Sequence, residues 1–265
     1  MSVTLKEVLD NLPELEDGKN VCIALSGGLD STTLVYVLVM KYGKDKVKAL
    51  SFDFGQRHKI ELEMASKTAK ILDIEHSIIK LDYLGEITKN VSSLIDGSDL
   101  KPKTAEENAG DPQVNTYVPF RNAQFAFITA AYAESKNCQF IFQATNAVDQ
   151  YGYWDTTEEF TKRINAVLEL NRQNLIQFIT PFTSYHKDEE LRIAREISND
   201  FGFDILKNTW SCYNGDSGNG KECGHCNTCE EKLTGYILAG YSDKEILDKF
   251  DITQEYLDNK RKDFE

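Results

Sequence analysis

The stretch Ala24-Leu25-Ser26-Gly27-Gly28-Leu29-Asp30-Ser31 decides the fold of this 265-residue chain. The apolar run Val21 to Leu25 precedes the glycines and suits a buried strand at about 20–25. Residues 31–42 are apolar nearly all round and end at Gly43, as expected of a buried helix. The glycine-rich turn therefore connects the carboxyl end of a strand to the amino end of a helix.

This turn predicts an anion-binding site. Gly27 and Gly28 permit positive φ and let a ligand approach the backbone closely. Ser26, Ser31 and Thr32 add hydroxyl groups to backbone N–H groups at the positive end of the helix dipole. An ordinary strand–turn–helix is the alternative, but the cluster Ser-Gly-Gly-x-Asp-Ser is more specific than that. No lysine precedes Ser31, so the turn is not a phosphate loop of the Gly-x-x-x-x-Gly-Lys-Ser/Thr type.

The rest of the chain alternates strands with helices. We expect strands at 20–25, 46–54, 74–81, 139–145 and 176–182, with helices at 4–12, 31–42, 60–72, 122–134, 157–171, 187–201, 242–249 and 253–262. This alternation predicts an α/β fold with a doubly wound parallel five-stranded sheet and right-handed crossovers. Residues 85–118 interrupt it with acidic residues, glycines and prolines. We expect a long loop there, which is either a lid or binding segment or a solvated spacer.

Composition limits the possible classes of protein. The length suits one large domain with an appendage, which we place at 1–205 and 206–265. The formal net charge of −13 argues against a large nucleic-acid-binding surface. The amino-terminal residues carry many charges, and the sequence shows no signal peptide or membrane span, so we expect a cytoplasmic protein. Cys22 and Cys138 lie alone in apolar runs and are interpreted as core residues.

Four further cysteines form a cluster with metal-ligand spacing: Cys212, Cys223, Cys226 and Cys229. Four thiolates complete a tetrahedral Zn²⁺ site without an open position, which is typical of structural zinc. His225 is a possible replacement ligand, and disulfides or an iron–sulfur cluster are the alternatives. A zinc ribbon that binds nucleic acid is disfavoured by Glu222 and two other nearby glutamates. We therefore expect a small zinc-binding carboxy-terminal lobe.

The glycine-rich turn resembles the PP-loop of ATP pyrophosphatases, which cleave ATP to AMP and pyrophosphate. Other motifs follow it in order: Phe52-Asp53-Phe54-Gly55-Gln56-Arg57-His58, Val118-Pro119-Phe120-Arg121-Asn122, Gly152-Tyr153, Thr180-Pro181 with Lys187, and Cys212-Tyr213-Asn214-Gly215. From about residue 20 to 235, this set is similar to the 7-cyano-7-deazaguanine synthase (QueC) family of queuosine precursor synthesis.

The resemblance implies a reaction. In the family, ATP adenylates the carboxylate of 7-carboxy-7-deazaguanine, and ammonia displaces AMP to give an amide. A second ATP activates the amide, and loss of AMP leaves the nitrile. ATP, Mg²⁺ and structural Zn²⁺ would be the cofactors, and a deazapurine acid and an amine would be the partners.

The resemblance also implies the residues of the site. The nucleotide would contact Leu25, Ser26, Gly27, Gly28, Asp30, Ser31, Thr32, Phe52, Asp53, Phe54 and Arg57. Catalysis would depend on Ser26, Asp30, Ser31, Arg121 and Lys187. The deazapurine acid would contact Arg121, Asn122, Asp149, Tyr151, Tyr153, Trp154 and Asp155.

Residue chemistry suits these roles. Asp30 suits Mg²⁺ or its waters, and Arg121 and Lys187 suit the α-phosphate and the departing pyrophosphate. Arg57 suits the substrate carboxylate or ATP. Surface salt bridges are the alternative for the cations, and strand termination or surface packing is the alternative for the aromatic residues.

The substrate side departs from the family pattern, which is close to x-Ser-Gly-Tyr-Pro-Asp-Cys-Arg. Here Tyr151 replaces Ser, Trp154 replaces Pro, and Thr157 stands where a cation is usual. Phe120 likewise replaces a glycine. A second hypothesis is therefore a related ligase that joins the deazapurine acid to another amine, including one on a partner protein.

A third hypothesis is a PP-loop protein that binds nucleotide or modifies tRNA without this ligase chemistry. The acidic balance disfavours it. We find no room for a glutamine-hydrolysing domain, so the amine is expected from outside. We also expect a homodimer, with residues 85–115 and 241–265 as candidates for packing it or recruiting a partner.

Overall fold

The computed structural model describes residues 3–103, 107, 113–149, 152–216 and 218–264. Five parallel strands form one sheet in the order β3-β2-β1-β4-β5. They are β1 (Asn20–Ala24), β2 (Val47–Asp53), β3 (Glu75–Lys80), β4 (Cys138–Phe142) and β5 (Gln177–Ile179). The chain builds outward from β1 to β3 and then returns to add β4 on the other side of β1. The predicted doubly wound sheet is confirmed, and its order changes direction between β1 and β4.

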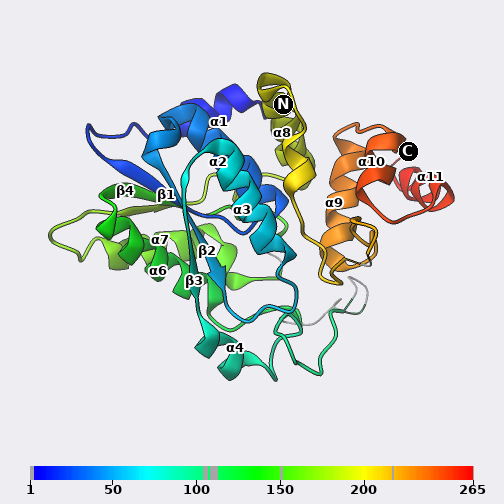
Figure 1. The fold of residues 1–265 in the computed structure, drawn as a ribbon, viewed down its shortest axis with the longest axis horizontal. Helices are drawn as coiled ribbons and strands as arrows, with labels where there is room; N and C mark the ends of the chain where they lie inside the picture. Colours follow the sequence, from blue (N-terminus) through cyan, green and yellow to red (C-terminus); the bar gives the residue numbers. More distant parts are fainter. Residues whose placement is uncertain (1–2, 104–106, 108–112, 150–151, 217, 265) are drawn as a thin grey trace.

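Helices cover both faces of the sheet (Figure 1). One face carries α1 (Leu5–Asn11), α2 (Leu29–Tyr42), α3 (Ile60–Leu72) and α8 (Lys187–Phe201); the other carries α4 (Asp82–Thr88), α6 (Arg121–Ser135) and α7 (Glu158–Leu168). Short 3-10 helices are η1 (Lys44–Lys46), η3 (Trp154–Thr156) and η4 (Ile205–Asn208). Parallel strands require both faces to be covered, which explains their nearly continuous apolar sequences.

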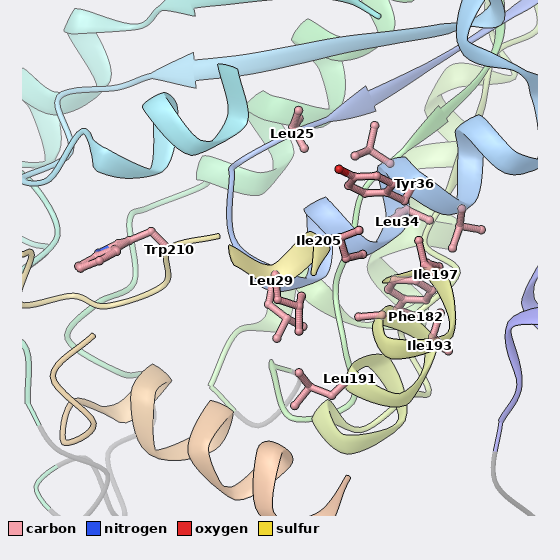
Figure 2. Close-up of a cluster of buried hydrophobic side chains, with 14 of the residues drawn as sticks. Leu25, Leu29, Leu34, Tyr36, Phe182, Leu191, Ile193, Ile197, Ile205 and Trp210 are labelled. Carbon is pink, nitrogen blue, oxygen red and sulfur yellow. The ribbon is translucent and has the colours of Figure 1, made fainter. Parts of the chain in front are cut away.

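The alternation of side chains along β1 separates the core into two clusters. Val21 and Ile23 pack with α2, α3 and α8, whereas Cys22 between them packs with α6 and α7. Figure 2 shows part of the first cluster, to which Tyr36 of α2 and Ile197 of α8 both contribute. Cys22 and Cys138 are buried, as expected of core residues.

The carboxy-terminal helices are α9 (Asn227–Leu238), α10 (Asp243–Lys249) and α11 (Gln254–Lys262). Their apolar residues Leu233, Ile246 and Leu257 belong to the same cluster as α2 and α8, so the core continues past residue 205. Helix α9 was not predicted, because its N-cap residue Cys226 and Cys229 in its first turn were interpreted only as metal ligands.

A buried ion cluster supports this region. Glu222 is completely buried and lies 2.8 Å from Lys232 Nζ and 3.2 Å from Lys249 Nζ. Burial disfavours its charge, but both lysines hold the pKa of Glu222 below its usual value. Since Glu222 is buried and paired, it adds no acidic surface near the cysteines that would disfavour a nucleic-acid-binding ribbon. Glu222 instead connects α9 to α10.

The expected long loop at 85–118 starts within α4, and part of it is packed against the fold. Ser92, Ser93 and Ile95 are buried, and the Leu94 carbonyl accepts a hydrogen bond of 2.8 Å from the backbone N–H of Arg57. Strand β5 is shorter than expected. No helix in the described part of the chain is long and apolar enough to span a membrane.

Candidate active site

A cavity of about 520 Å³ lies at the carboxyl ends of β1, β2 and β4. Its walls come from the glycine-rich turn, the end of β2, the first turns of α3 and α6, the segment after β4, and the cysteine-containing lobe. The cavity includes the point where the strand order changes direction. Ligands of open α/β sheets bind at this point.

The glycine-rich turn is held by hydrogen bonds among its own residues. The Ser26 N–H donates to Ser31 Oγ at 3.1 Å, and the two hydroxyl oxygens lie 2.9 Å apart. The Gly28 N–H donates to Ser26 Oγ at 3.2 Å, and Gly28 is the N-cap residue of α2. Ser26, Gly28, Asp30 and Ser31 all line the cavity. The positive end of the α2 dipole therefore opens into the cavity, as an anion site requires.

Two neighbouring segments fix the back of the turn. Gly27 has φ +89°, and a Cβ at this position would lie 2.0 Å from the backbone oxygen of Glu61 in α3. The Trp210 N–H donates to the Gly27 carbonyl at 3.0 Å. A glycine is required here both by the backbone conformation and by the closeness of α3. The turn is thus clamped between α3 and the start of the cysteine-containing lobe.

A buried charged pair lies beside the turn. Lys187 Nζ lies 2.6 Å from Asp30 Oδ1, and both side chains are largely buried. Burial opposes both charges, but their attraction outweighs it, so the pKa of Asp30 is lowered and the pKa of Lys187 is raised. Burial and the charge of Asp30 raise the pKa of the completely buried Glu190 well above its usual value. Burial therefore favours the neutral form of Glu190, whereas the attraction between Lys187 and Asp30 favours their charged forms.

Arg121 supplies a second cation to the cavity. Its guanidinium carbon lies 5.6 Å from the centroid of the Phe54 ring and 5.9 Å from that of Phe125. No carboxylate of the described residues forms an ion pair with it, and its buried Nε has no hydrogen-bond partner in the same part of the chain. A cation held against aromatic rings without a protein anion is suited to an anionic ligand.

Glu61 offers an unpaired carboxyl group to the same cavity. Its side chain makes no hydrogen bond or ion pair with any described residue. Burial raises the pKa of Glu61 to about 7, although the nearby charge of Arg121 opposes the shift.

The structure brings most of the expected nucleotide residues to the cavity, but not all of them. Leu25, Phe52 and Phe54 line it, and the Phe52 ring stacks on Phe125 with centroids 4.1 Å apart. Arg57 also lines it, although its guanidinium donates to the carbonyls of Ser98 and Leu100, both at 2.9 Å. Gly27, Thr32 and Asp53 are not among the described lining residues. Asp53 is paired with Lys59 Nζ at 2.9 Å.

Some of the expected substrate residues line the cavity and others do not. Asn122, Asp149 and Tyr153 line the cavity, and burial raises the pKa of Asp149. Trp154 and Asp155 are not among the described lining residues, and Trp154 Nε1 donates to Tyr117 Oη at 2.9 Å. Tyr151 lies outside the described residues. Thr157, at the position of the missing cation, caps α7 by accepting from the Phe160 N–H at 3.2 Å.

Several lining residues were missed by sequence reasoning. They are Glu61, Phe125, Gln143, Tyr213, Asn227, Thr228 and Glu231. Gln143 gave a signal, since it is a polar residue directly after the apolar run Phe140-Ile141-Phe142. The residues of α9 gave none, because only the tertiary structure brings this helix to the cavity.

The four clustered cysteines converge as expected. Their Sγ atoms all lie within 4.8 Å of one another, and Cys212, Cys226 and Cys229 are buried. A tetrahedral zinc ion with Zn–S bonds of about 2.3 Å needs sulfur atoms about 3.8 Å apart, so this set fits a metal ion after a small contraction. Cys223 Sγ accepts from the backbone N–H groups of His225 and Cys226, each at 3.4 Å. His225 itself packs edge-on against Tyr256, with ring centroids 4.8 Å apart.

The chain is similar to known proteins over most of its length. A family model described as "Queuosine biosynthesis protein QueC" matches residues 20–240. A 7-cyano-7-deazaguanine synthase from Picrophilus torridus is 38% identical over 251 residues, which cover 92% of this chain and 98% of that protein. Another from Chromobacterium violaceum is 31% identical over 221 residues, covering 83% and 90%. Among solved structures, the U34-tRNA thiolase NcsA from Methanococcus maripaludis is a distant likeness with a TM-score of 0.47 and 19% identity, covering 74% of this chain and 63% of that one.

The matched region contains the glycine-rich turn, the cavity and all four clustered cysteines. The chain therefore belongs to the QueC family and is an enzyme of the ATP-dependent ligase type.

Proposed function

We propose that this enzyme adenylates the carboxylate of 7-carboxy-7-deazaguanine with ATP, releases pyrophosphate, and transfers the acyl group to ammonia with release of AMP. A second round of activation would convert the amide to the nitrile. The observation that carries the proposal is the cavity itself. It joins a glycine-rich turn at a helix amino terminus to a cation, Arg121, that has no described protein anion as a partner.

The charges of the site suit adenylation. A carboxylate that attacks the α-phosphate brings two anions together, so catalysis needs fixed positive groups around them. The backbone N–H groups at Gly28 and the hydroxyls of Ser26 and Ser31 would bind the β- and γ-phosphates. Lys187 and Arg121 would stabilise the charge that develops on the α-phosphate and on the departing pyrophosphate.

Aromatic and acidic groups would position the two bases. Phe52 and Phe54 provide an apolar wall at the end of β2, where an adenine can lie. On the other side of the cavity, Tyr153 and Asp149 offer an aromatic surface and an acceptor for N–H groups of a guanine-like ring. The reacting carboxylate would then lie between the two subsites, near Arg121.

The residues fit two metal ions. Asp30 has the chemistry of a magnesium ligand, and Mg²⁺ would neutralise phosphate charge when bound. The four cysteines would hold Zn²⁺, whose contribution is structural because no coordination position remains open. Since Trp210 and Cys212 lie in one short segment, a metal ion held by the cysteines would also help to keep the Trp210 N–H against the Gly27 carbonyl.

The acceptor amine is the finer part of the proposal. Free ammonia gives the amide and then the nitrile, whereas a larger amine gives a secondary amide that cannot become a simple nitrile. Three of the residues that depart from the family pattern, Phe120, Trp154 and Thr157, do not line the described cavity, which favours ammonia as the acceptor; the fourth, Tyr151, lies outside the described residues.

The test is to incubate the protein with 7-carboxy-7-deazaguanine, ATP, Mg²⁺ and ammonium, and to analyse nucleotides and products by chromatography and mass spectrometry. We expect AMP together with the amide or nitrile. Ser26→Ala and Asp30→Ala should stop AMP release while circular dichroism shows a retained fold. ADP as the sole nucleotide product would refute adenylation. AMP that forms only when another amine is added would refute ammonia as the acceptor.

A further inference from the structure

Gln143 presents an unused amide group to the cavity. It directly follows the last residue of β4, beside β1, and its side chain is only 9% exposed. Its buried Oε1 has no hydrogen-bond partner, and no described residue pairs with its Nε2. Only its backbone is engaged, since the N–H donates to the Ile179 carbonyl at 3.1 Å.

Of the polar groups next to Gln143, the Thr145 hydroxyl and the Asn146 side-chain oxygen are satisfied within the protein, whereas the buried Asn146 Nδ2, which is not among the described cavity-lining atoms, also lacks a partner. Thr145 Oγ1 lies 3.1 Å from Thr183 Oγ1. Asn146 Oδ1 accepts from the backbone N–H groups of Val148 at 2.9 Å and Asp149 at 3.2 Å. Buried side-chain oxygens nearly always have a donor, and an unpaired one destabilises the protein that contains it. Because Gln143 lines the cavity, its unpaired oxygen points to a donor that arrives with a ligand.

We propose that the side-chain amide of Gln143 reads the edge of a bound purine-type base, accepting from an exocyclic amino group and donating to the adjacent ring nitrogen. The inference rests on the proposed function, because that reaction brings such bases into this cavity. A primary amide offers one acceptor and two donors side by side, and glutamine pairs with adenine through such a two-bond contact. The interaction needs no charge, which suits a position close to the apolar end of β4.

Two bases in the reaction present such an edge. Adenine of ATP has its 6-amino group next to ring nitrogens, and 7-deazaguanine has its 2-amino group next to ring nitrogens. A guanine nucleotide has an oxo group at position 6, so Gln143 would discriminate against it if the adenine is the base that it reads. The two sources can be separated by measuring each ligand alone.

The experiment uses isothermal titration calorimetry with two ligands, α,β-methylene-ATP with Mg²⁺ and 7-carboxy-7-deazaguanine. Gln143→Met keeps the length of the side chain and removes both hydrogen-bonding groups. We expect one of the two dissociation constants to rise about 10- to 100-fold, as the loss of two neutral hydrogen bonds implies. Because the lost amide has no partner in the free protein, the unfolding temperature should not fall.

Gln139 provides the matched control. It lies on the same strand, but its amide is already used, with Oε1 accepting from the Glu16 N–H at 2.9 Å and Nε2 donating to Glu16 Oε1 at 3.2 Å. Gln139→Met should leave both dissociation constants unchanged. Gln143→Glu, which keeps an acceptor but loses the donor, should weaken the same ligand as Gln143→Met.

The outcomes distinguish the sources and the hypotheses. Weaker binding of the ATP analogue, with lost discrimination against the corresponding GTP analogue, assigns Gln143 to adenine. Weaker binding of the acid alone assigns it to deazaguanine. If the wild type binds both ligands and Gln143→Met changes neither constant by more than twofold, the inference is wrong while the proposed function stands. If the wild type binds neither ligand, the proposed function fails and this inference fails with it.

Discussion

Replacing Gly27 by alanine tests whether the shape of the glycine-rich turn makes the nucleotide site. The added Cβ would lie 2.0 Å from the Glu61 carbonyl oxygen. Since a carbon and an oxygen pack no closer than about 3.3 Å, the turn or α3 must move by roughly 1 Å. Alanine must also adopt the φ of +89° found at Gly27.

The expected cost can be divided into two parts. The left-handed backbone costs an alanine about 1–2 kcal/mol. The clash with a packed helix adds about 1–3 kcal/mol, so Gly27→Ala should lower the free energy of unfolding by about 2–5 kcal/mol. A 1 Å displacement of a positioned group lowers a rate about 100-fold, and we expect this loss in AMP formation.

Gly18→Ala is the matched control. Gly18 has φ +77°, but a Cβ there would meet nothing within 4 Å. This variant should show only the backbone cost of about 1–2 kcal/mol and keep its AMP formation. Urea unfolding and the initial rate of AMP release measure the two effects. Equal stability and equal activity in the two variants would refute the reasoning.

Three further predictions concern the charges and the metal site. Lys187→Met leaves Asp30 buried without its partner, so the free energy of unfolding should fall by about 3–5 kcal/mol and AMP formation should be lost. Adding Asp30→Asn to this variant should restore its stability but not its activity. A Lys187→Met variant as stable as the wild type would contradict the role of the ion pair. Cys226→Ser should lower both the zinc content by elemental analysis and the unfolding temperature, and a native protein without zinc would contradict the metal assignment. Burial raises the pKa of Glu61 from the ordinary 4.5 to about 7, so the folded state binds the proton more tightly and loses stability as pH rises from about 5 to 7. Glu61→Gln should be as stable as the wild type near pH 4.5 and about 1–3 kcal/mol more stable at pH 8. If the free energies of unfolding of the two proteins differ by the same amount at every pH, Glu61 does not titrate in this range.

Local sequence patterns predicted the sheet and the glycine-rich turn well. The apolar run of β1 and the glycines after it determine a strand–turn–helix unit through backbone geometry alone, and the structure confirms it. The cysteines were equally clear, because ligand spacing is a local property.

Long-range packing explains what the sequence did not reveal. The ion pairs of Glu222 were not predicted, because its partners Lys232 and Lys249 are distant in sequence and meet it only after α9 and α10 have packed. Glu61 follows an expected motif, but its exposure to the cavity depends on how α3 lies against the turn. Trp154 was expected to contact the substrate because it follows the Gly152-Tyr153 motif. In the structure it donates a hydrogen bond to Tyr117 and is not among the described lining residues.

The central claim is that the cavity at the carboxyl ends of β1 and β4 joins AMP to a carboxylate. It is tested most directly with 7-carboxy-7-deazaguanine that carries ¹⁸O in both carboxylate oxygens, with ATP, Mg²⁺ and ammonium. When ammonia attacks an acyl adenylate, the bridging oxygen leaves with AMP. The account predicts AMP that is heavier by one ¹⁸O atom. Unlabelled AMP, or ADP in its place, would contradict it.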